Sequence, residues 1–198
     1  MTVIGITGPT GAGKTTVLNV LKELGGAVVD CDAVYHELLD SDFTLRDLLE
    51  ERFGPLKRED GTIDRKKLGA MVFHDPAALD DLNRIAHGRV VVEISERLGR
   101  ARESGIQLAA IDAIALFESG AAELCRTTVA VTASDEVRVR RIMAREGISE
   151  EYARARIAAQ KPSQWFEEHC DHILRNDGGR EEFEEKARTL LLSIIPTE

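Results

Sequence analysis

The segment that most constrains the fold is GITGPTGAGKTT, which occupies residues 5–16. Gly8 is followed, after four residues, by Gly13-Lys14-Thr15, which is the spacing of a loop that holds phosphate groups. The β-branched run TVIGIT precedes this loop, and KTTVLNVLKELG follows it with apolar residues at helical spacing. The sequence therefore predicts a strand, a phosphate-binding loop and a helix in direct succession.

Further apolar segments indicate the rest of a sheet. Strand-like runs occupy residues 26–30, 106–113, 127–133 and 171–176, and segments with helical patterns separate them. Strands that alternate with helices predict an α/β fold with a five-stranded parallel sheet covered on both faces. The length of 198 residues fits a single unit, residues 1–198.

Four polar features follow predicted strands. They are the loop after Thr7, the Asp-Cys-Asp that begins at Asp30, Asp112, and Asn176. Ligands of parallel sheets bind beyond the carboxyl ends of the strands, so we expect these features to converge on one site.

Composition excludes several classes of function. The net charge of −9 comes without a basic patch, so we expect no nucleic-acid partner. Cys31, Cys125 and Cys170 are widely spaced and predict neither a zinc site nor a disulfide framework. Without a long apolar run or a targeting segment, we expect a cytoplasmic protein with no membrane association.

The phosphate loop predicts the donor chemistry. Its backbone N–H groups and the helix N-terminus attract a nucleotide phosphate, the Lys14 side chain reaches the β- and γ-phosphates of ATP, and the Thr15 hydroxyl binds Mg²⁺.

Two acidic positions have two interpretations each. Asp32 is either a carboxylate that accepts or orients the proton of an attacking hydroxyl, or the N-cap of the helix AVYHELL. Asp112 is either an acid that acts on Mg²⁺, directly or through water, or a strand-end residue.

Other polar residues remain equally open. Glu118 and His87 are either site residues or ordinary surface or packed side chains, and Trp165 and Phe166 either stack on adenine or pack in a core or hinge. The densest basic stretch either neutralises a transferring phosphoryl group or forms pairs with nearby glutamates. Its members are Arg138, Arg140, Arg141, Arg145, Arg154 and Arg156, of which Arg141 and Arg145 lie on one helix face.

Read in order, these segments resemble the dephospho-coenzyme A kinase family. The resemblance spans nearly the whole chain and rests on the phosphate loop, VVDCDAVYHELL, DGTIDRKKLGAMVFHDPAALDDLN, IAHGRV, RIMAREGISEEYARARIAAQ and CDHILRNDG. It implies a three-layer P-loop NTPase fold with a helical substrate region at about 40–100 and a helical lid at about 138–165. It also implies ATP- and Mg²⁺-dependent phosphorylation of the ribose 3′-hydroxyl of dephospho-CoA, by a monomer or weak homo-oligomer.

The resemblance assigns roles residue by residue. Asp32, Lys14 and Arg141 are expected to be catalytic, and Thr15 and Asp112 to hold the metal. Substrate contacts are expected from Asp32, His87, Leu116, Phe117 and Glu118. The residues expected to bind the nucleotide are Gly8, Gly11, Ala12, Gly13, Lys14, Thr15, Thr16, Arg145 and Asn176.

Three positions depart from the family pattern. Gly88 stands where a proline is usual, Ile114 lies in a loop that lacks its usual proline, and Phe166 replaces a lysine. These departures keep two alternatives open, namely a kinase of another nucleoside, nucleotide or small-metabolite hydroxyl and a weakly active nucleotide-binding paralogue.

Overall fold

The fold is built on one parallel sheet. The computed structural model describes residues 1–195 and contains strands β1 (Thr2–Thr7), β2 (Ala27–Asp30), β3 (Leu108–Asp112), β4 (Thr127–Thr132) and β5 (His172–Arg175). All neighbours pair in parallel, in the order β2-β3-β1-β4-β5. The prediction of a five-stranded parallel sheet is confirmed, and the last three residues of the predicted 1–198 unit lie outside the described residues.

The central strands are apolar because both of their faces are covered. In β1, Val3 packs into one hydrophobic cluster and Ile4 and Ile6 pack into another on the opposite face. In β3, Ile111 belongs to the first cluster and Ala110 to the second. The two-residue period of a strand therefore serves two cores, as expected for a parallel sheet between helical layers.

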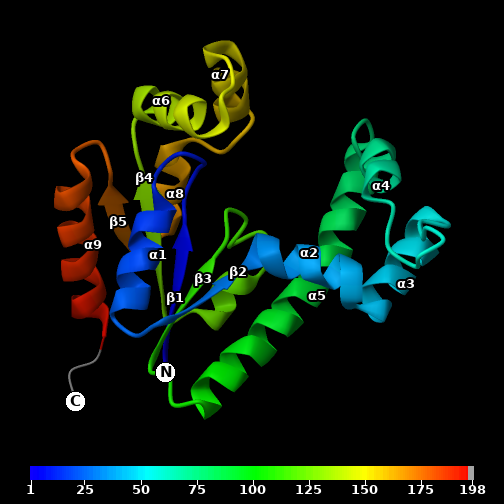
Figure 1. Cartoon of the computed structure of the whole chain (residues 1–198), viewed down its shortest axis with the longest axis horizontal. Helices are drawn as coiled ribbons and strands as arrows, with labels where there is room; N and C mark the ends of the chain where they lie inside the picture. The colour runs from blue at the N-terminus through cyan, green and yellow to red at the C-terminus, as the bar shows by residue number, and fades with distance from the viewer. Residues whose placement is uncertain (196–198) are drawn as a thin grey trace.

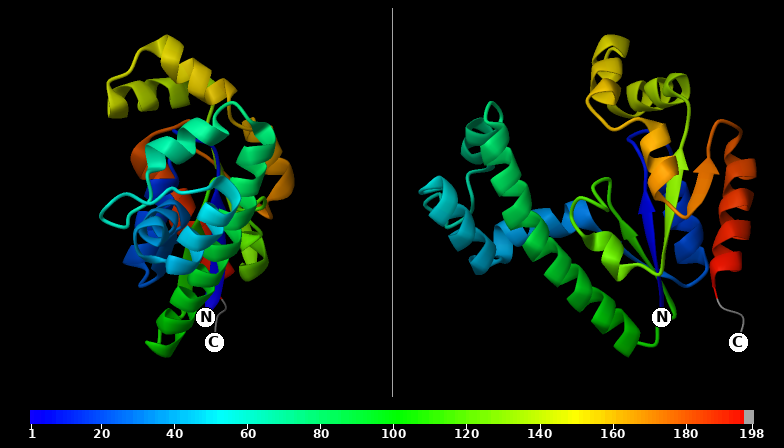
Figure 2. Two further views of the ribbon diagram at one scale, coloured as in Figure 1. Left: turned by 90° about the vertical axis from the view of Figure 1, so that its right-hand side faces the viewer. Right: turned by 180° about the vertical axis from the view of Figure 1, so that it is seen from behind.

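Helices cover each face of the sheet. Helix α1 (Lys14–Glu23) packs against α9 (Arg180–Ile194) on one face (Figure 1). Helix α8 (Ser163–His169) packs on β4 on the other face, as the rear view in Figure 2 shows, and α5 (Pro76–Glu103) packs against β2. No helix was predicted for these residues, and α8 forms because the fully buried Phe166 anchors it on the sheet.

A helical arm extends from the β2 side of the sheet (Figure 1). We use this name for residues 31–103, which comprise α2 (Cys31–Ser41), α3 (Phe43–Phe53), α4 (Arg65–Val72) and α5. Asp42, Asp64 and Asp75 cap the last three of these helices through backbone N–H groups. Pro76 occupies the first turn of α5, where a helix tolerates its missing N–H group.

A second helical unit lies above the carboxyl ends of the strands. Helices α6 (Asp135–Glu146) and α7 (Glu150–Ala158) follow β4 and pack around a small core of Val139, Ile142 and Ala153. The pair projects over the phosphate loop and faces the arm across the sheet edge (Figure 1). None of the helices among residues 1–195 combines the length and the apolar character that a membrane crossing requires.

Candidate active site

The phosphate loop connects β1 to α1, and its glycines are required by the packing around it. Gly8 and Gly13 have φ values of 139° and 106°, a region that side-chain-bearing residues rarely adopt. A Cβ atom at Gly8 would collide with the carbonyl oxygen of Val131 in β4, and one at Gly13 would collide with the Asn176 side chain. The loop therefore lies tightly against the protein on one side and is open on the other.

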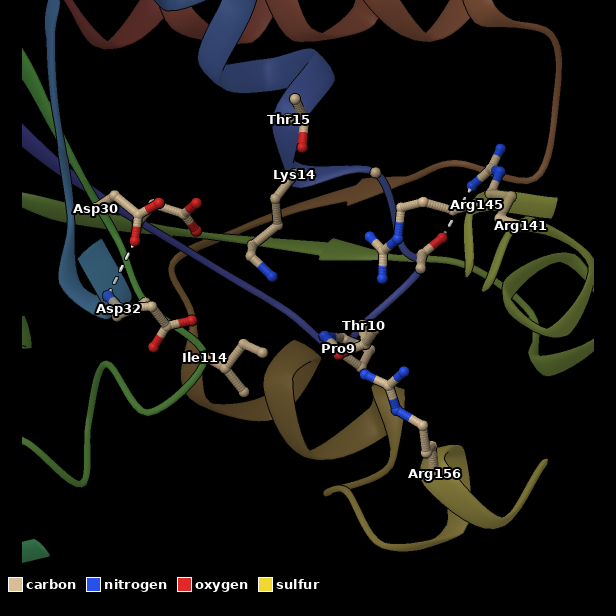
Figure 3. A pocket seen from close by; sticks show the side chains of 14 residues that line it. Pro9, Thr10, Lys14, Thr15, Asp30, Asp32, Ile114, Arg141, Arg145 and Arg156 are labelled. Atoms are coloured by element: carbon tan, nitrogen blue, oxygen red, sulfur yellow. Dashed lines mark hydrogen bonds between the residues drawn. The ribbon is translucent and has the colours of Figure 1, made fainter. Parts of the chain in front are cut away.

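A cavity of about 430 Å³ lies in front of the loop. Figure 3 shows that Lys14 points into it, with Asp30 and Asp32 on one side and Arg141, Arg145 and Arg156 on the other. Opposite charges thus face each other across a space that a polyphosphate and a hydroxyl group can enter. The cavity is lined by Pro9, Thr10, Gly11, Gly13, Lys14, Thr15, Asp30, Asp32, Asp112, Ala113, Ile114, Arg141, Arg145 and Arg156.

The two aspartates after β2 have different roles. Asp30 caps α2, because its Oδ1 accepts the backbone N–H groups of Asp32 at 2.9 Å and Ala33 at 3.0 Å. The alternative that Asp32 is the N-cap is therefore wrong. Asp32 lies in the first turn of α2, exposed to the cavity, so its carboxylate is directed at the open space.

Asp112 is the acid buried deepest in this cavity. Its Oδ1 is the one buried side-chain polar atom among the described residues that has no hydrogen-bond partner. Burial raises the pKa of Asp112 to about 6, although nearby Lys14 opposes this. An unpartnered carboxylate oxygen of this kind fits a hydrated cation or a cationic side chain.

Lys14 lies at the base of the same cavity. Its ammonium group donates to the carbonyl oxygen of Gly8 at 3.0 Å. Burial lowers the pKa of Lys14, and the negative charges of Asp112 and Asp32 oppose that shift. The ammonium group is therefore held under the loop, within the field of the acids.

Three arginines from the α6–α7 unit reach the cavity. Arg141 donates to the carbonyl oxygen of Ala12 at 3.3 Å and to Asn176 at 3.1 Å. Arg145 and Arg156 both pair with Glu146, which holds the two guanidinium groups together at the cavity edge. The sequence analysis singled out Arg141 and Arg145; Arg156 was not distinguished from its neighbours, because only the packing of α7 on α6 brings it there.

Arg138, Arg140 and Arg154 do not line this cavity. Arg154 pairs with Glu150 one turn away on α7, as the glutamate-pairing alternative predicted. Arg138 is only 1% exposed and contacts Asp135 and the phosphate loop. Sequence reasoning missed Arg138 as a support of the loop, since a charged residue in an amphipathic helix is normally solvated.

A second cavity, of about 200 Å³, adjoins the first. The two share Asp32, Ala113 and Ile114, so Asp32 lies at the junction. His87 is one wall residue, and burial lowers the pKa of its imidazole. The remaining wall is mainly apolar with a few polar groups and is formed by Cys31, Tyr35, Leu82, Asn83, Ala86, Val90, Ala115 and Ser119.

Within residues 112–118, the side chains that line the cavities differ from those expected to contact the substrate. Leu116 is fully buried in the core, so its expected contact with substrate is corrected. Phe117 packs edge-on against Trp165 at 5.8 Å, and Glu118 pairs with Lys161, so both are turned toward the segment around α8. Ala113 and Ile114 line the cavities instead.

Several residues expected at the nucleotide do not line the cavity. Asn176 is 5% exposed and donates to the carbonyl oxygen of Ala12 at 2.8 Å, which makes it a support of the loop. Ala12 is fully buried. Gly8 and Thr16 are likewise absent from the residues that line the cavity.

The three unusual positions have different surroundings. Ile114 lies on both cavities. Phe166 is 1% exposed and faces the core, so that position offers no surface to a ligand. A Cβ at Gly88 would meet nothing within 4 Å. Among the three, Ile114 is therefore the position that can affect ligand choice directly.

Few protein oxygens at this cavity are available to a Mg²⁺ ion. Within residues 1–195, no three His, Cys, Asp or Glu side chains are grouped as a metal cage. The Thr15 side chain and the unpartnered Asp112 oxygen nevertheless border the same cavity as the loop. This pattern fits Mg²⁺, which keeps several waters and is usually held by few protein oxygens together with substrate phosphates.

The parallel topology and a phosphate loop that faces acids across a cavity place the protein among the P-loop kinases. The chain matches the Dephospho-CoA kinase family over residues 2–182 and belongs to that family. The dephospho-CoA kinase of Carboxydothermus hydrogenoformans is 35% identical over 96% of this chain and 92% of that protein. The dephospho-CoA kinase of Geobacter sulfurreducens is 33% identical over 99% and 100% of the two chains.

Solved structures agree with this assignment. TT1252 from Thermus thermophilus is 33% identical, covers 99% of this chain and 98% of that chain, and has a TM-score of 0.81. Dephospho-CoA kinase from Campylobacter jejuni is 26% identical over 98% and 97% of the chains, with a TM-score of 0.62. A shikimate kinase from Bacteroides thetaiotaomicron, 17% identical with a TM-score of 0.56 over 96% and 98%, shares the fold alone.

Proposed function

We propose that this enzyme transfers the γ-phosphate of ATP to the ribose 3′-hydroxyl of dephospho-CoA, giving coenzyme A and ADP. The position of Asp32 carries the proposal within the family assignment. This carboxylate borders both the cavity at the phosphate loop and the adjoining cavity between the arm and the sheet. A hydroxyl that enters from the arm side therefore meets Asp32 next to the nucleotide phosphates.

The donor side is formed by the phosphate loop. The N–H groups of Gly11, Gly13 and the first turn of α1 attract phosphate oxygens. Lys14 neutralises charge on the terminal phosphates. Thr15 would be a ligand of a bound Mg²⁺ and Asp112 would hold its water molecules, and the ion would neutralise further phosphate charge.

The acceptor side is formed by the arm. The second cavity is large enough for part of a nucleoside and mostly apolar, which suits the adenosine part of dephospho-CoA. His87 contributes a polar contact, and Ile114 shapes the passage between the cavities. Asp32 accepts or orients the proton of the 3′-hydroxyl as the oxygen attacks phosphorus.

Helices α6 and α7 act as the lid. Arg141, Arg145 and Arg156 bring positive charge to the transferring phosphoryl group from the side opposite Asp32. Closure of this unit over the loop excludes water and limits hydrolysis of ATP. The protein works in the cytoplasm on small-molecule substrates, as a monomer or weak homo-oligomer.

An ADP-release assay with alternative acceptors tests the proposal. Dephospho-CoA, adenosine and nucleoside monophosphates are compared at equal concentrations, and the coenzyme A formed is identified by mass. We expect the highest kcat/KM with dephospho-CoA. Turnover of another acceptor without turnover of millimolar dephospho-CoA would contradict the proposal and favour a kinase of different specificity.

A further inference from the structure

Gln160, two residues beyond the end of α7, contacts the tip of the phosphate loop. Its Nε2 donates to Thr10 Oγ1 at 2.7 Å, and its Oε1 accepts the backbone N–H of Thr10 at 3.1 Å. Both hydrogen-bonding groups of one side-chain amide are therefore used on one residue of the loop. The bidentate contact determines the orientation of Thr10 as well as its distance from the lid.

Arg138, at the other end of the lid, completes this contact. Its Nε donates to the carbonyl oxygen of Thr10 at 2.9 Å, and its Nη2 donates to Gln160 Oε1 at 3.0 Å. Arg138 is 1% exposed, and these hydrogen bonds are partly buried. Arg138 in the first turn of α6 and Gln160 beyond α7 thus hold Thr10 through three side-chain hydrogen bonds to its backbone and hydroxyl group.

These bonds orient the peptide groups that face a phosphate. In a planar trans peptide the C=O and the following N–H point in opposite directions. Arg138 holds the Thr10 carbonyl oxygen toward α6. The N–H of Gly11, in the same peptide group, therefore points away from α6. Asn176 does the same for the carbonyl of Ala12 and the N–H of Gly13. Gly11 and Gly13 both line the cavity.

We propose that Gln160 is a positioning residue for nucleotide binding, which acts with Arg138 to set the loop for phosphate before the nucleotide arrives. Because both ends of the lid hold the same residue, occupation of the loop and the position of the lid are coupled. The inference rests on the nucleotide half of the proposed function and is independent of the acceptor.

Gln160→Met tests the proposal, because it keeps the side-chain length and removes both hydrogen-bonding groups. Gln164→Met is the matched control, since Gln164 contacts only the exposed Glu168 in the same helix. In the nucleotide-free protein, hydrogen exchange at the Thr10 amide is expected to quicken at least about tenfold in Gln160→Met. Calorimetry is expected to show about tenfold weaker ADP binding, with Tm and the KM for the acceptor close to wild type.

Two more variants separate positioning from mere packing. Gln160→Glu keeps an acceptor for the Thr10 N–H, the Thr10 hydroxyl and Arg138, so it is expected to restore ADP affinity. Thr10→Val removes only the hydroxyl contact, and combining it with Gln160→Met should weaken ADP binding by less than the product of the two single effects.

Three results would overturn the proposal. They are unchanged ADP affinity in Gln160→Met, additive effects in the double variant, and equal loss of nucleotide and acceptor binding together with a large fall in Tm. Failure of the wild-type protein to phosphorylate dephospho-CoA would contradict the proposed acceptor but would leave the exchange and ADP-binding measurements meaningful. The two proposals therefore fail separately.

Discussion

Asp30 accepts the backbone N–H of Asp32 through its Oδ1 at 2.9 Å, and this single hydrogen bond separates the roles of the two acids. Because Asp30 caps α2, the Asp32 side chain is not needed to cap this helix. The Asp32 carboxylate is consequently available at the junction of the two cavities.

Substitution of the two acids should separate catalysis from capping. Asp32→Asn is expected to lower kcat by about 10²–10⁴-fold without lowering Tm, because it removes a proton acceptor. Asp30→Ala is expected to cost about 1 kcal/mol of stability through loss of the cap. The measurements are ADP release and urea unfolding, and wild-type turnover by Asp32→Asn would remove Asp32 from the mechanism.

Lys14→Ala is expected to abolish phosphoryl transfer and to leave the fold intact. Its ammonium group donates to the Gly8 carbonyl oxygen and otherwise faces the cavity. The substitution should therefore weaken nucleotide binding more than it lowers the stability of the fold. Circular dichroism beside the ADP-release rate checks this, with Lys22→Ala in the last turn of the same helix as the control. An unfolded Lys14→Ala protein would show that Lys14 has a structural role.

Asp112 should destabilise the nucleotide-free protein above its pKa. The folded-state pKa, about 6, exceeds the ordinary value of 3.8, so the folded protein binds this proton more tightly than the unfolded chain does. The contribution of Asp112 to stability is therefore present at low pH and is lost as pH rises through about 6.

Asp112→Asn removes this ionisation. We expect the variant to exceed wild type in unfolding free energy by on the order of 2 kcal/mol at pH 7.5, with a smaller difference at pH 4.5. Its phosphoryl transfer should be much slower. Chemical unfolding at the two pH values measures the effect, and a difference independent of pH would argue against the ionisation of Asp112 as its cause.

Arg156→Ala should slow phosphoryl transfer, whereas Arg154→Ala should not. The two arginines lie on the same helix, but Arg156 lines the cavity and Arg154 pairs with Glu150 at the surface. Loss of a cationic group at a transferring phosphoryl is expected to lower kcat by about 10²-fold. Equal rates for the two variants would show that Arg156 does not contact the phosphoryl group during its transfer.

His87→Ala should weaken acceptor binding selectively. His87 lines the second cavity and is absent from the first, so the KM for dephospho-CoA should rise severalfold while the KM for ATP stays constant. His74→Ala, at the arm surface next to Phe73, is the control. A parallel change in both KM values would show that His87 acts through the fold.

Much of the fold was predictable because its signals are local. The strand pattern of residues 127–133 and the helix that follows the phosphate loop each depend on neighbours within one element, and the structure confirms both. Helix α8 was missed, since it is short and its stability comes from the burial of Phe166 on the sheet.

The candidate site was harder to predict from the sequence where its contacts join residues that are far apart along the chain. Leu116 and Asn176 were expected to contact ligands. Leu116 is instead buried in the core, and Asn176 donates a hydrogen bond to the phosphate loop from behind. Arg156 and Ile114 reach the cavity through packing between elements, which no spacing within one segment encodes.

By itself, the sequence determined the phosphate loop, the alternation of strands and helices, and the presence of acids after β2 and β3, because hydrogen bonding and hydrophobic periodicity act over a few residues. Only the tertiary structure decided that Asp30 caps while Asp32 faces the cavities, and that Gln160 and Arg138 hold Thr10. Those contacts join groups up to 150 residues apart, and their geometry exists only once the sheet and the lid are packed.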